Sequence, residues 1–277
     1  MTKTVLITGC SSGFGLAAVG LFADEGWNVV ATVRRLEDGA PFAGRDNVLV
    51  ARLDVQDPAT IEAAIQAGID RFGGIDALIN NAGFGLFGVF EGTSPEKVRE
   101  QFDVNVFGLM ETTRAILPHF RANRSGVVVN ITSGAGVFGL PMSSLYNASK
   151  FAVEGFSEAL SYELEPLGVR VKLVEPGGVL ATKFGQRVGA EAAQTTAPED
   201  YAPIIAAGET LFEGLRAVRR GATPADVARV MLEACMDRTD RLRWVATDDI
   251  KPLVALRREA GEDVYWAEMR KAFALKG

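Results

Sequence analysis

Short apolar runs alternate with longer amphipathic stretches along this chain. The runs lie at residues 4–8, 28–33, 48–53, 76–79, 127–132, 169–174 and 242–246. Such runs, rich in Val, Ile and Leu, are typical of parallel strands buried on both faces. The stretches between them have the length and periodicity of helices. The pattern predicts an α/β fold in which residues 1–277 form one doubly wound domain, with a mostly parallel seven-stranded sheet and helices on both faces.

Three helices have clear sequence signals at their first residues. Asp or Ser/Thr followed by Pro combines an N-cap with a residue that suits the first turn. These signals are Asp57-Pro58, Ser94-Pro95 and Thr223-Pro224. The first helix is expected to end near Phe72 and the third near Asp237. The second is expected to be one long helix that continues to about Asn123.

The last third of the chain has weaker patterns. Gly, Ala, Gln, Thr and Pro interrupt residues 180–222, which predicts an irregular, mobile substrate lid. Residues 248–277 are expected to form a helical tail in which Trp266 and Phe273 pack inward.

A glycine-rich turn follows the first strand. Strand, glycine turn and helix in that order suit a phosphate, because the backbone approaches it closely and helix N–H groups bind its charge. The spacing, Gly9-x3-Gly13-x-Gly15, differs from the usual dinucleotide fingerprint. A purely structural turn is the alternative.

The end of the second strand bears on the choice of dinucleotide. An acidic residue there would bind the free ribose 2′-hydroxyl of NAD. This chain has Val33 and then Arg34-Arg35, and a guanidinium suits the 2′-phosphate of NADP. NADP is therefore expected over NAD, the alternative being two solvated arginines.

The stretch from Ser133 to Lys150 carries the candidate chemistry. Tyr146 and Lys150 lie four residues apart, on one face of an expected helix, and Ser133 ends a buried strand. A nearby cation lowers the pKa of a phenol, which makes Tyr146 a candidate general acid/base. An exposed pair on a surface helix is the alternative.

Composition excludes several classes of function. The net charge is −6, whereas proteins that bind nucleic acid are typically basic. Two isolated cysteines, Cys10 and Cys235, and a single histidine, His119, leave no metal-ligand pattern and favour a reducing compartment. No signal segment precedes the first strand, and no apolar run reaches the about 18 residues that span a membrane. We therefore expect a cytoplasmic protein with no membrane span and no metal.

Spaced motifs resemble the short-chain dehydrogenase/reductase family over about residues 3–250. They are Thr8-Gly9-x3-Gly13-x-Gly15, Asn80-Asn81-Ala82-Gly83, Asn105, Ser133, Tyr146-x3-Lys150 and Pro176-Gly177. The sequence around these motifs is most similar to that of the branch that contains the 17β-hydroxysteroid and retinol dehydrogenases. The resemblance implies a Rossmann fold and hydride exchange between a nicotinamide cofactor and a carbonyl or alcohol.

The resemblance also implies a role for each catalytic residue. Tyr146 would be the general acid in reduction and the base in oxidation. Lys150 would lower its pKa and bind the nicotinamide ribose. Ser133 would hydrogen-bond the substrate oxygen. Asn105, through a backbone distortion and a bound water, would connect Lys150 to a proton relay.

Further positions match the family's cofactor contacts. They are Thr8, Gly9, Ser11, Ser12, Gly13, Phe14 and Gly15 in the phosphate turn, Asp54 and Val55 at the adenine, Asn81, Ala82 and Gly83 at a strand end, and Pro176, Gly177 and Val179 beside the nicotinamide. One position departs from the family pattern. A threonine often stands five residues after that proline, where this chain has Ala181, and Thr182 comes one residue late.

The sequence thus predicts an NADP-dependent oxidoreductase of a ketone or aldehyde and its alcohol. Apolar loop residues favour a hydrophobic small molecule, with ordinary core packing as the alternative. They are Phe84, Leu86, Phe87, Val137, Phe138, Leu140 and Met142. A catalytically silent NADP sensor and an epimerase or dehydratase are the other functions considered. The resemblance implies a homodimer or homotetramer whose subunits meet through the helices that carry Asn105 and Tyr146. A monomer is the alternative.

Overall fold

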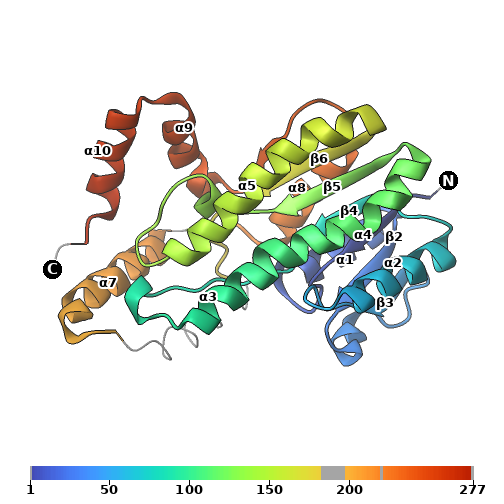
Figure 1. The fold of residues 1–277 in the computed structure, drawn as a ribbon, viewed down its shortest axis with the longest axis horizontal. Helices are drawn as coiled ribbons and strands as arrows, with labels where there is room; N and C mark the ends of the chain where they lie inside the picture. Colours follow the sequence, from blue (N-terminus) through green and yellow to red (C-terminus); the bar gives the residue numbers. More distant parts are fainter. Residues whose placement is uncertain (1, 182–196, 219–220, 276–277) are drawn as a thin grey trace.

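A seven-stranded sheet forms the centre of the protein (Figure 1). The computed structural model describes residues 2–181, 197–218 and 221–275. The strands are β1 (Thr4–Ile7), β2 (Asn28–Val33), β3 (Val48–Arg52), β4 (Ala77–Asn80), β5 (Gly126–Ile131), β6 (Val169–Glu175) and β7 (Arg243–Val245). Every neighbouring pair is parallel, which confirms the predicted α/β fold class and makes the sheet wholly parallel.

The strand order places a crevice at one point of the sheet. The order is β3-β2-β1-β4-β5-β6-β7, so the chain moves outward from β1 to one side and from β4 to the other. In doubly wound sheets, ligands bind outside the carboxyl ends of the strands at such a reversal. The glycine turn after β1 and the segment 81–83 after β4 therefore meet at this crevice.

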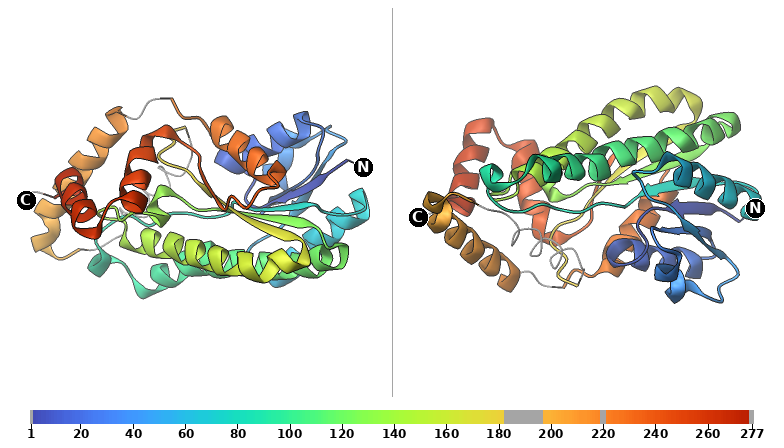
Figure 2. Two further views of the ribbon diagram at one scale, coloured as in Figure 1. Left: turned by 90° about the horizontal axis from the view of Figure 1, so that it is seen from above. Right: turned by 60° about the horizontal axis from the view of Figure 1, so that its bottom comes forward.

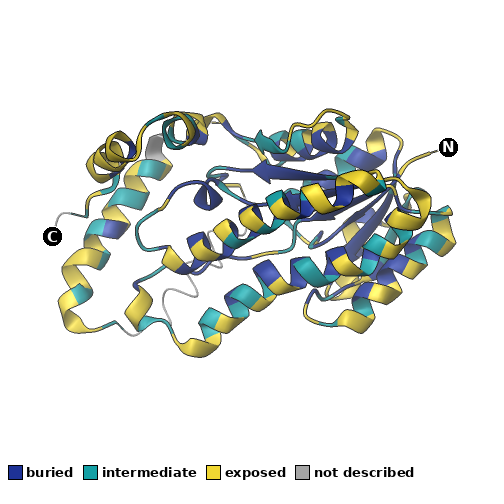
Figure 3. Ribbon diagram, turned by 45° about the horizontal axis from the view of Figure 1, so that its top comes forward, coloured by how far each residue is buried: buried dark blue, intermediate teal, exposed yellow. Residues whose placement is uncertain are grey.

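Helices cover both faces of the sheet (Figure 2). One face carries α1 (Gly13–Asp24) and α8 (Pro224–Met236), and the other carries α2 (Pro58–Phe72), α4 (Gly108–Asn123) and α5 (Ser144–Leu164). Alternate strand residues enter the two cores: Val5 and Ile7 pack toward α1, and Leu6 packs toward α2. Figure 3 shows the result, buried strands between helices that expose their outer sides.

The predicted helix starts are confirmed by their caps. The side chain of Asp57 accepts from the N–H of Ala59, and that of Ser94 accepts from the N–H of Lys97. Thr223 and Asp226 form a reciprocal capping box.

The helix predicted from Ser94 to Asn123 is not continuous. It consists of α3 (Pro95–Phe102), a π-helical turn η3 (Asp103–Phe107) and α4. Asn105 lies in this turn, and its buried amide bonds outside the helix, to Phe84 and Ser149. Such π-turns are frequent at functional sites.

The prediction of an irregular segment at 180–222 is wrong for its second half. Residues 202–218 form the helix α7 (Ala202–Val218), and residues 182–196 lie outside the described part of the chain. The sequence of α7 is as amphipathic as that of α2, so this helix had a local signal that the interruptions around it obscured.

The tail is helical, as predicted, but its packing differs. It contains α9 (Lys251–Glu259) and α10 (Glu262–Phe273), which lie with α7 beyond the carboxyl edge of the sheet (Figure 1). Trp266 is 57% exposed, contrary to the prediction, while Phe273 packs against the buried cluster that includes Tyr265 and Met269. The remaining short 3-10 helices are η1 (Leu36–Phe42), η2 (Phe90–Gly92), η4 (Gly134–Gly136), η5 (Glu165–Leu167), η6 (Glu199–Tyr201) and η7 (Asp248–Ile250). Among the described helices, none is long and apolar enough to cross a bilayer.

Candidate active site

A cavity of about 2150 Å³ opens at the carboxyl edge of the sheet and reaches α7 and the tail. Most of the predicted site residues line it. They are Gly9, Ser11, Ser12, Gly13, Phe14, Arg34, Asp54, Val55, Asn81, Ala82, Gly83, Ser133, Tyr146, Lys150, Pro176, Gly177 and Val179. Thr8, Gly15 and Asn105 lie outside the lining, and Thr182 falls outside the described residues.

The glycine turn has the shape that a pyrophosphate requires. Gly9 and Gly13 have φ of 73° and 58°, a region that favours glycine. A Cβ on Gly15 would overlap the carbonyl oxygen of Gly9 and lie 2.7 Å from Nδ2 of Asn81. Ser12 does not cap α1 with its side chain, so the first N–H groups of this helix remain available to an anion. These residues fit a dinucleotide.

Thr8 has a structural role beneath this turn. Its hydroxyl accepts from the N–H groups of Asn81 at 2.9 Å and Ala82 at 3.0 Å. The side-chain amide of Asn81 donates to the carbonyl oxygens of Thr8 at 2.8 Å and Gly9 at 3.1 Å. Together they join the ends of β1 and β4, which sets the width of the crevice.

The two arginines after β2 differ in their surroundings. Arg35 forms an ion pair with Asp38 at 3.0 Å, and Asp38 together with Glu37 raises the pKa of its guanidinium. Both arginines line the cavity and are exposed, but Arg34 has no ion-pair partner among the described residues. Arg34 is thus the guanidinium that could receive an anionic ligand.

Tyr146 and Ser133 meet inside the cavity. Burial raises the pKa of Tyr146 to about 12, and a hydrogen bond with Ser133 opposes that rise. The Ser133 hydroxyl also accepts from the N–H of Ala135 at 3.1 Å. A raised pKa runs against the expectation from sequence, because desolvation of the buried phenol outweighs the hydrogen bond with Ser133.

Lys150 lies beside this pair. Its Nζ donates to the carbonyl oxygen of Ile131 at 2.8 Å and lies 5.8 Å from the centre of the Tyr146 ring. Burial lowers the pKa of Lys150 to about 8, partly offset by Glu154. Lys150 can therefore change its protonation state close to neutral pH.

Asn105 supports the site from behind. Its Nδ2 donates to Phe84 O at 2.8 Å and Ser149 Oγ at 3.2 Å, and its Oδ1 accepts from Phe84 N at 3.0 Å. The carboxamide thus holds the segment after β4 against α5. The π-turn is the backbone distortion that the resemblance implied at this residue.

The far side of the cavity is apolar. Of the predicted loop residues, Phe84, Phe87, Phe138, Leu140 and Met142 line it, whereas Leu86 and Val137 pack in the core. Sequence reasoning missed the lining from α7 and the tail, namely Ile205, Phe212, Ile250, Leu253 and Phe273. The ring of Phe87 lies 5.8 Å from both Tyr146 and Phe212, so apolar surface continues from the candidate chemistry to α7. Among the described residues, no group of His, Cys, Asp and Glu could hold a metal ion.

Comparisons with known proteins identify the family. The model of the short chain dehydrogenase family matches residues 3–193. An uncharacterised oxidoreductase of Schizosaccharomyces pombe is 36% identical, over 83% of this chain and 94% of its own length. Retinol dehydrogenase 8 of Bos taurus is 34% identical, over 92% of this chain and 85% of its own length. The chain therefore belongs to the short-chain dehydrogenase/reductase family and is an oxidoreductase.

Solved structures agree in fold. A short-chain dehydrogenase from Streptomyces avermitilis is 31% identical, with a TM-score of 0.80 over 98% of this chain and 96% of its own. A Burkholderia phymatum family member in complex with NAD is 28% identical, with a TM-score of 0.78 over 100% and 97%. A serine dehydrogenase complexed with NADP⁺ is 30% identical, with a TM-score of 0.75 over 87% and 94%.

Proposed function

We propose that this protein is an NADP(H)-dependent oxidoreductase that interconverts a ketone or aldehyde and its alcohol. The observation that carries the proposal is the hydrogen-bonded pair of Tyr146 and Ser133, inside the cavity and beside Lys150. This arrangement offers a proton donor and a hydrogen-bond donor to one substrate oxygen.

Each of these side chains has a distinct role in the proposal. The nicotinamide supplies or accepts the hydride. In reduction, Tyr146 gives the proton of its hydroxyl to the substrate oxygen; with a pKa of about 12, it is in the protonated form that this step needs. Ser133 orients the same oxygen. Lys150 stabilises the resulting phenolate by its charge, and Asn105 holds the adjoining backbone in place.

The cofactor contacts follow from the cavity lining. The glycine turn and the start of α1 would hold the pyrophosphate, Asp54 and Val55 the adenine, and Pro176, Gly177 and Val179 the nicotinamide side. Solved relatives include complexes of both NAD and NADP⁺. The preference for NADP therefore depends on Arg34, which lines the cavity without an ion-pair partner among the described residues.

A hydrophobic substrate is proposed from the aromatic and aliphatic lining beyond Tyr146. The test is consumption of NADPH with ketones of matched reactivity and increasing apolar size. We expect KM to fall as the apolar part grows, because each buried CH₂ contributes about 0.8 kcal/mol. A preference for small polar carbonyls would contradict the substrate class but not the reaction.

We also propose that the chain is one domain and that it forms a homodimer or homotetramer through α4 and α5. Large apolar side chains are exposed on α5, at Phe151 and Tyr162, and at Phe107 in the π-turn that directly precedes α4. Light scattering would show two or four copies, and Phe151→Glu should reduce that number. A monomeric wild type would contradict this proposal. A cytoplasmic location is proposed from the two free, buried cysteines.

A further inference from the structure

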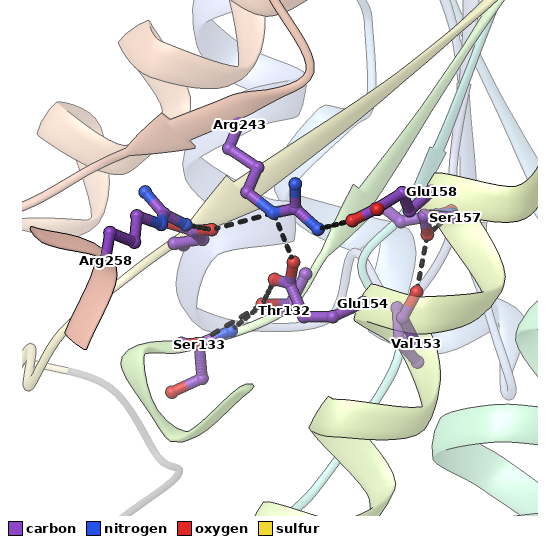
Figure 4. Close-up of polar contacts among 10 residues, drawn as sticks. Thr132, Ser133, Val153, Glu154, Ser157, Glu158, Arg243 and Arg258 are labelled. Carbon is purple, nitrogen blue, oxygen red and sulfur yellow. Dashed lines mark hydrogen bonds and ion pairs between the residues drawn. The ribbon is translucent and has the colours of Figure 1, made fainter. Parts of the chain in front are cut away.

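A cluster of four charged side chains lies directly behind the candidate active site (Figure 4). Glu154 comes from α5, Glu175 from the end of β6, Arg243 from β7 and Arg258 from α9. Nε of Arg243 lies 3.0 Å from Glu154 and 3.8 Å from Glu175, and Arg258 forms an ion pair with Glu175. Arg243 also pairs with Glu158 on the outer side of α5. Two arginines from the C-terminal part of the chain thus neutralise two buried carboxylates.

One arm of this cluster reaches Ser133. The hydroxyl of Thr132 donates to the Glu154 carboxylate at 2.6 Å, and the N–H of Ser133 donates to the same hydroxyl. Figure 4 shows this path from Arg243 through Glu154 and Thr132 to Ser133. The charge state of the cluster therefore bears on the backbone that presents the Ser133 hydroxyl.

The other arm reaches the turn after β6. Glu175 directly precedes Pro176 and Gly177, which line the cavity. The N–H of Gly177 donates to the Thr247 hydroxyl at 2.8 Å, and that of Gly178 donates to Asp249 at 3.0 Å. Side-chain and backbone contacts from residues 243–258 thus hold both ends of this turn.

Glu175 is the carboxylate of this cluster whose hydrogen bonding is incomplete. Its side chain has 0% exposure, and its Oε2 has no hydrogen-bond partner among the described residues. Burial, and then Glu154, raise the pKa of Glu175 to about 7, against Arg258 and Arg243. Removing one partner of a buried ion pair leaves an uncompensated charge, which is strongly unfavourable. A carboxylate so placed needs both arginines whenever it is ionised.

We propose that Arg258 is a positioning residue of the active site, which neutralises Glu175 and so holds the turn of Pro176 and Gly177 against the cofactor cleft. Arg243 neutralises Glu154 in the same way, and through Thr132 it holds the backbone of Ser133 in place. The proposal rests on the function proposed above. It assigns a task at the site to a segment that lies beyond residue 193, where the match to the family model ends.

The test uses Arg258→Gln in the full-length protein, with Arg257→Gln as its matched control. Arg257 lies on the same helix and loses the same charge, but it pairs with Glu262 on α10. We expect Arg258→Gln to lower kcat/KM and weaken NADPH binding about ten- to hundredfold at pH 8.5, where Glu175 of the wild type is ionised. Arg258 lowers the pKa of this carboxyl, so the variant must either bury the charge with one cation fewer or take up a proton at this pH. At pH 6 the loss should be within about threefold, since a protonated Glu175 needs no cation. The control should stay within about threefold of wild type at both pH values.

A second variant separates positioning from simple loss of packing. Glu175→Gln combined with Arg258→Gln should restore kcat/KM and NADPH affinity at pH 8.5 to within about fivefold of wild type, because the neutral amide needs no cation. An unchanged defect in the double variant, or one equal at pH 6 and pH 8.5, would overturn the proposal.

NADPH titration and melting temperature are measured on all four proteins at both pH values. If the wild type reduced no carbonyl, the proposed function would fail, and these two readouts would still decide the role of Arg258. Recovery of both in the double variant supports positioning through Glu175. Absence of recovery contradicts it.

Discussion

The ammonium of Lys150 lies 5.8 Å from the centre of the Tyr146 ring, while its hydrogen bond goes to the carbonyl oxygen of Ile131. Both side chains are buried, and burial moves both pKa values toward the neutral form, to about 12 for Tyr146 and about 8 for Lys150. The protein alone therefore disfavours the charged forms of the two groups on which the proposed chemistry depends.

This cost predicts a pH-dependent stability. In the unfolded chain, Lys150 keeps its proton up to about pH 10.5, but in the folded protein it loses the proton near pH 8. Between these values the unfolded state binds more protons, so the folded state becomes more stable as pH rises. The free energy of unfolding of wild type, relative to Lys150→Met, should therefore increase by roughly 2–4 kcal/mol across this range. Denaturant titrations from pH 7 to 10.5 without cofactor would measure it; parallel curves would show that Lys150 is not desolvated.

Arg34 should decide the choice of cofactor. Arg34→Ala is expected to raise KM for NADPH about ten- to a hundredfold, the value of a charge-assisted contact, and to leave KM for NADH unchanged. Arg35→Ala is the control, because Arg35 is already paired with Asp38. Steady-state kinetics with both cofactors would measure this. Equal effects of the two substitutions would contradict the assignment of the 2′-phosphate to Arg34.

The close approach of Gly15 to Gly9 should be intolerant of a side chain. Gly15→Ala is expected to destabilise the protein by about 1–3 kcal/mol and to weaken NADPH binding, because the added methyl overlaps the turn. Gly20→Ala, in the same helix, meets no atom within 4 Å and should stabilise by about 0.5–1 kcal/mol. Thermal unfolding and NADPH titration would compare the two. A Gly15→Ala protein as stable as Gly20→Ala would mean that the turn adapts.

Local patterns were sufficient for the sheet and most helix starts. Five of the strands are apolar runs that are almost wholly buried, and the edge strands β3 and β7 are partly buried. Each cap is a short motif, so a single segment carries enough information. The switch between β1 and β4 then follows from the order of strands, and it brings the motifs of Gly9 and Asn81 together.

Contacts distant in sequence could not be predicted in this way. The π-turn at Asn105 depends on bonds to Phe84 and Ser149. The pairing of Glu175 with Arg258 joins residues 83 positions apart. The pKa of Tyr146 was expected to fall because only its neighbour Lys150 was visible in the sequence, whereas its burial was not.

The most direct test of the proposed function is Tyr146→Phe. Phenylalanine fills nearly the same buried space but has no proton to give. We measure kcat for oxidation of NADPH with the best ketone substrate, together with the NADPH dissociation constant. We expect kcat to fall at least about a hundredfold, with cofactor affinity within about threefold of wild type. Turnover within tenfold of wild type would contradict Tyr146 as the general acid/base and, with it, the proposed mechanism.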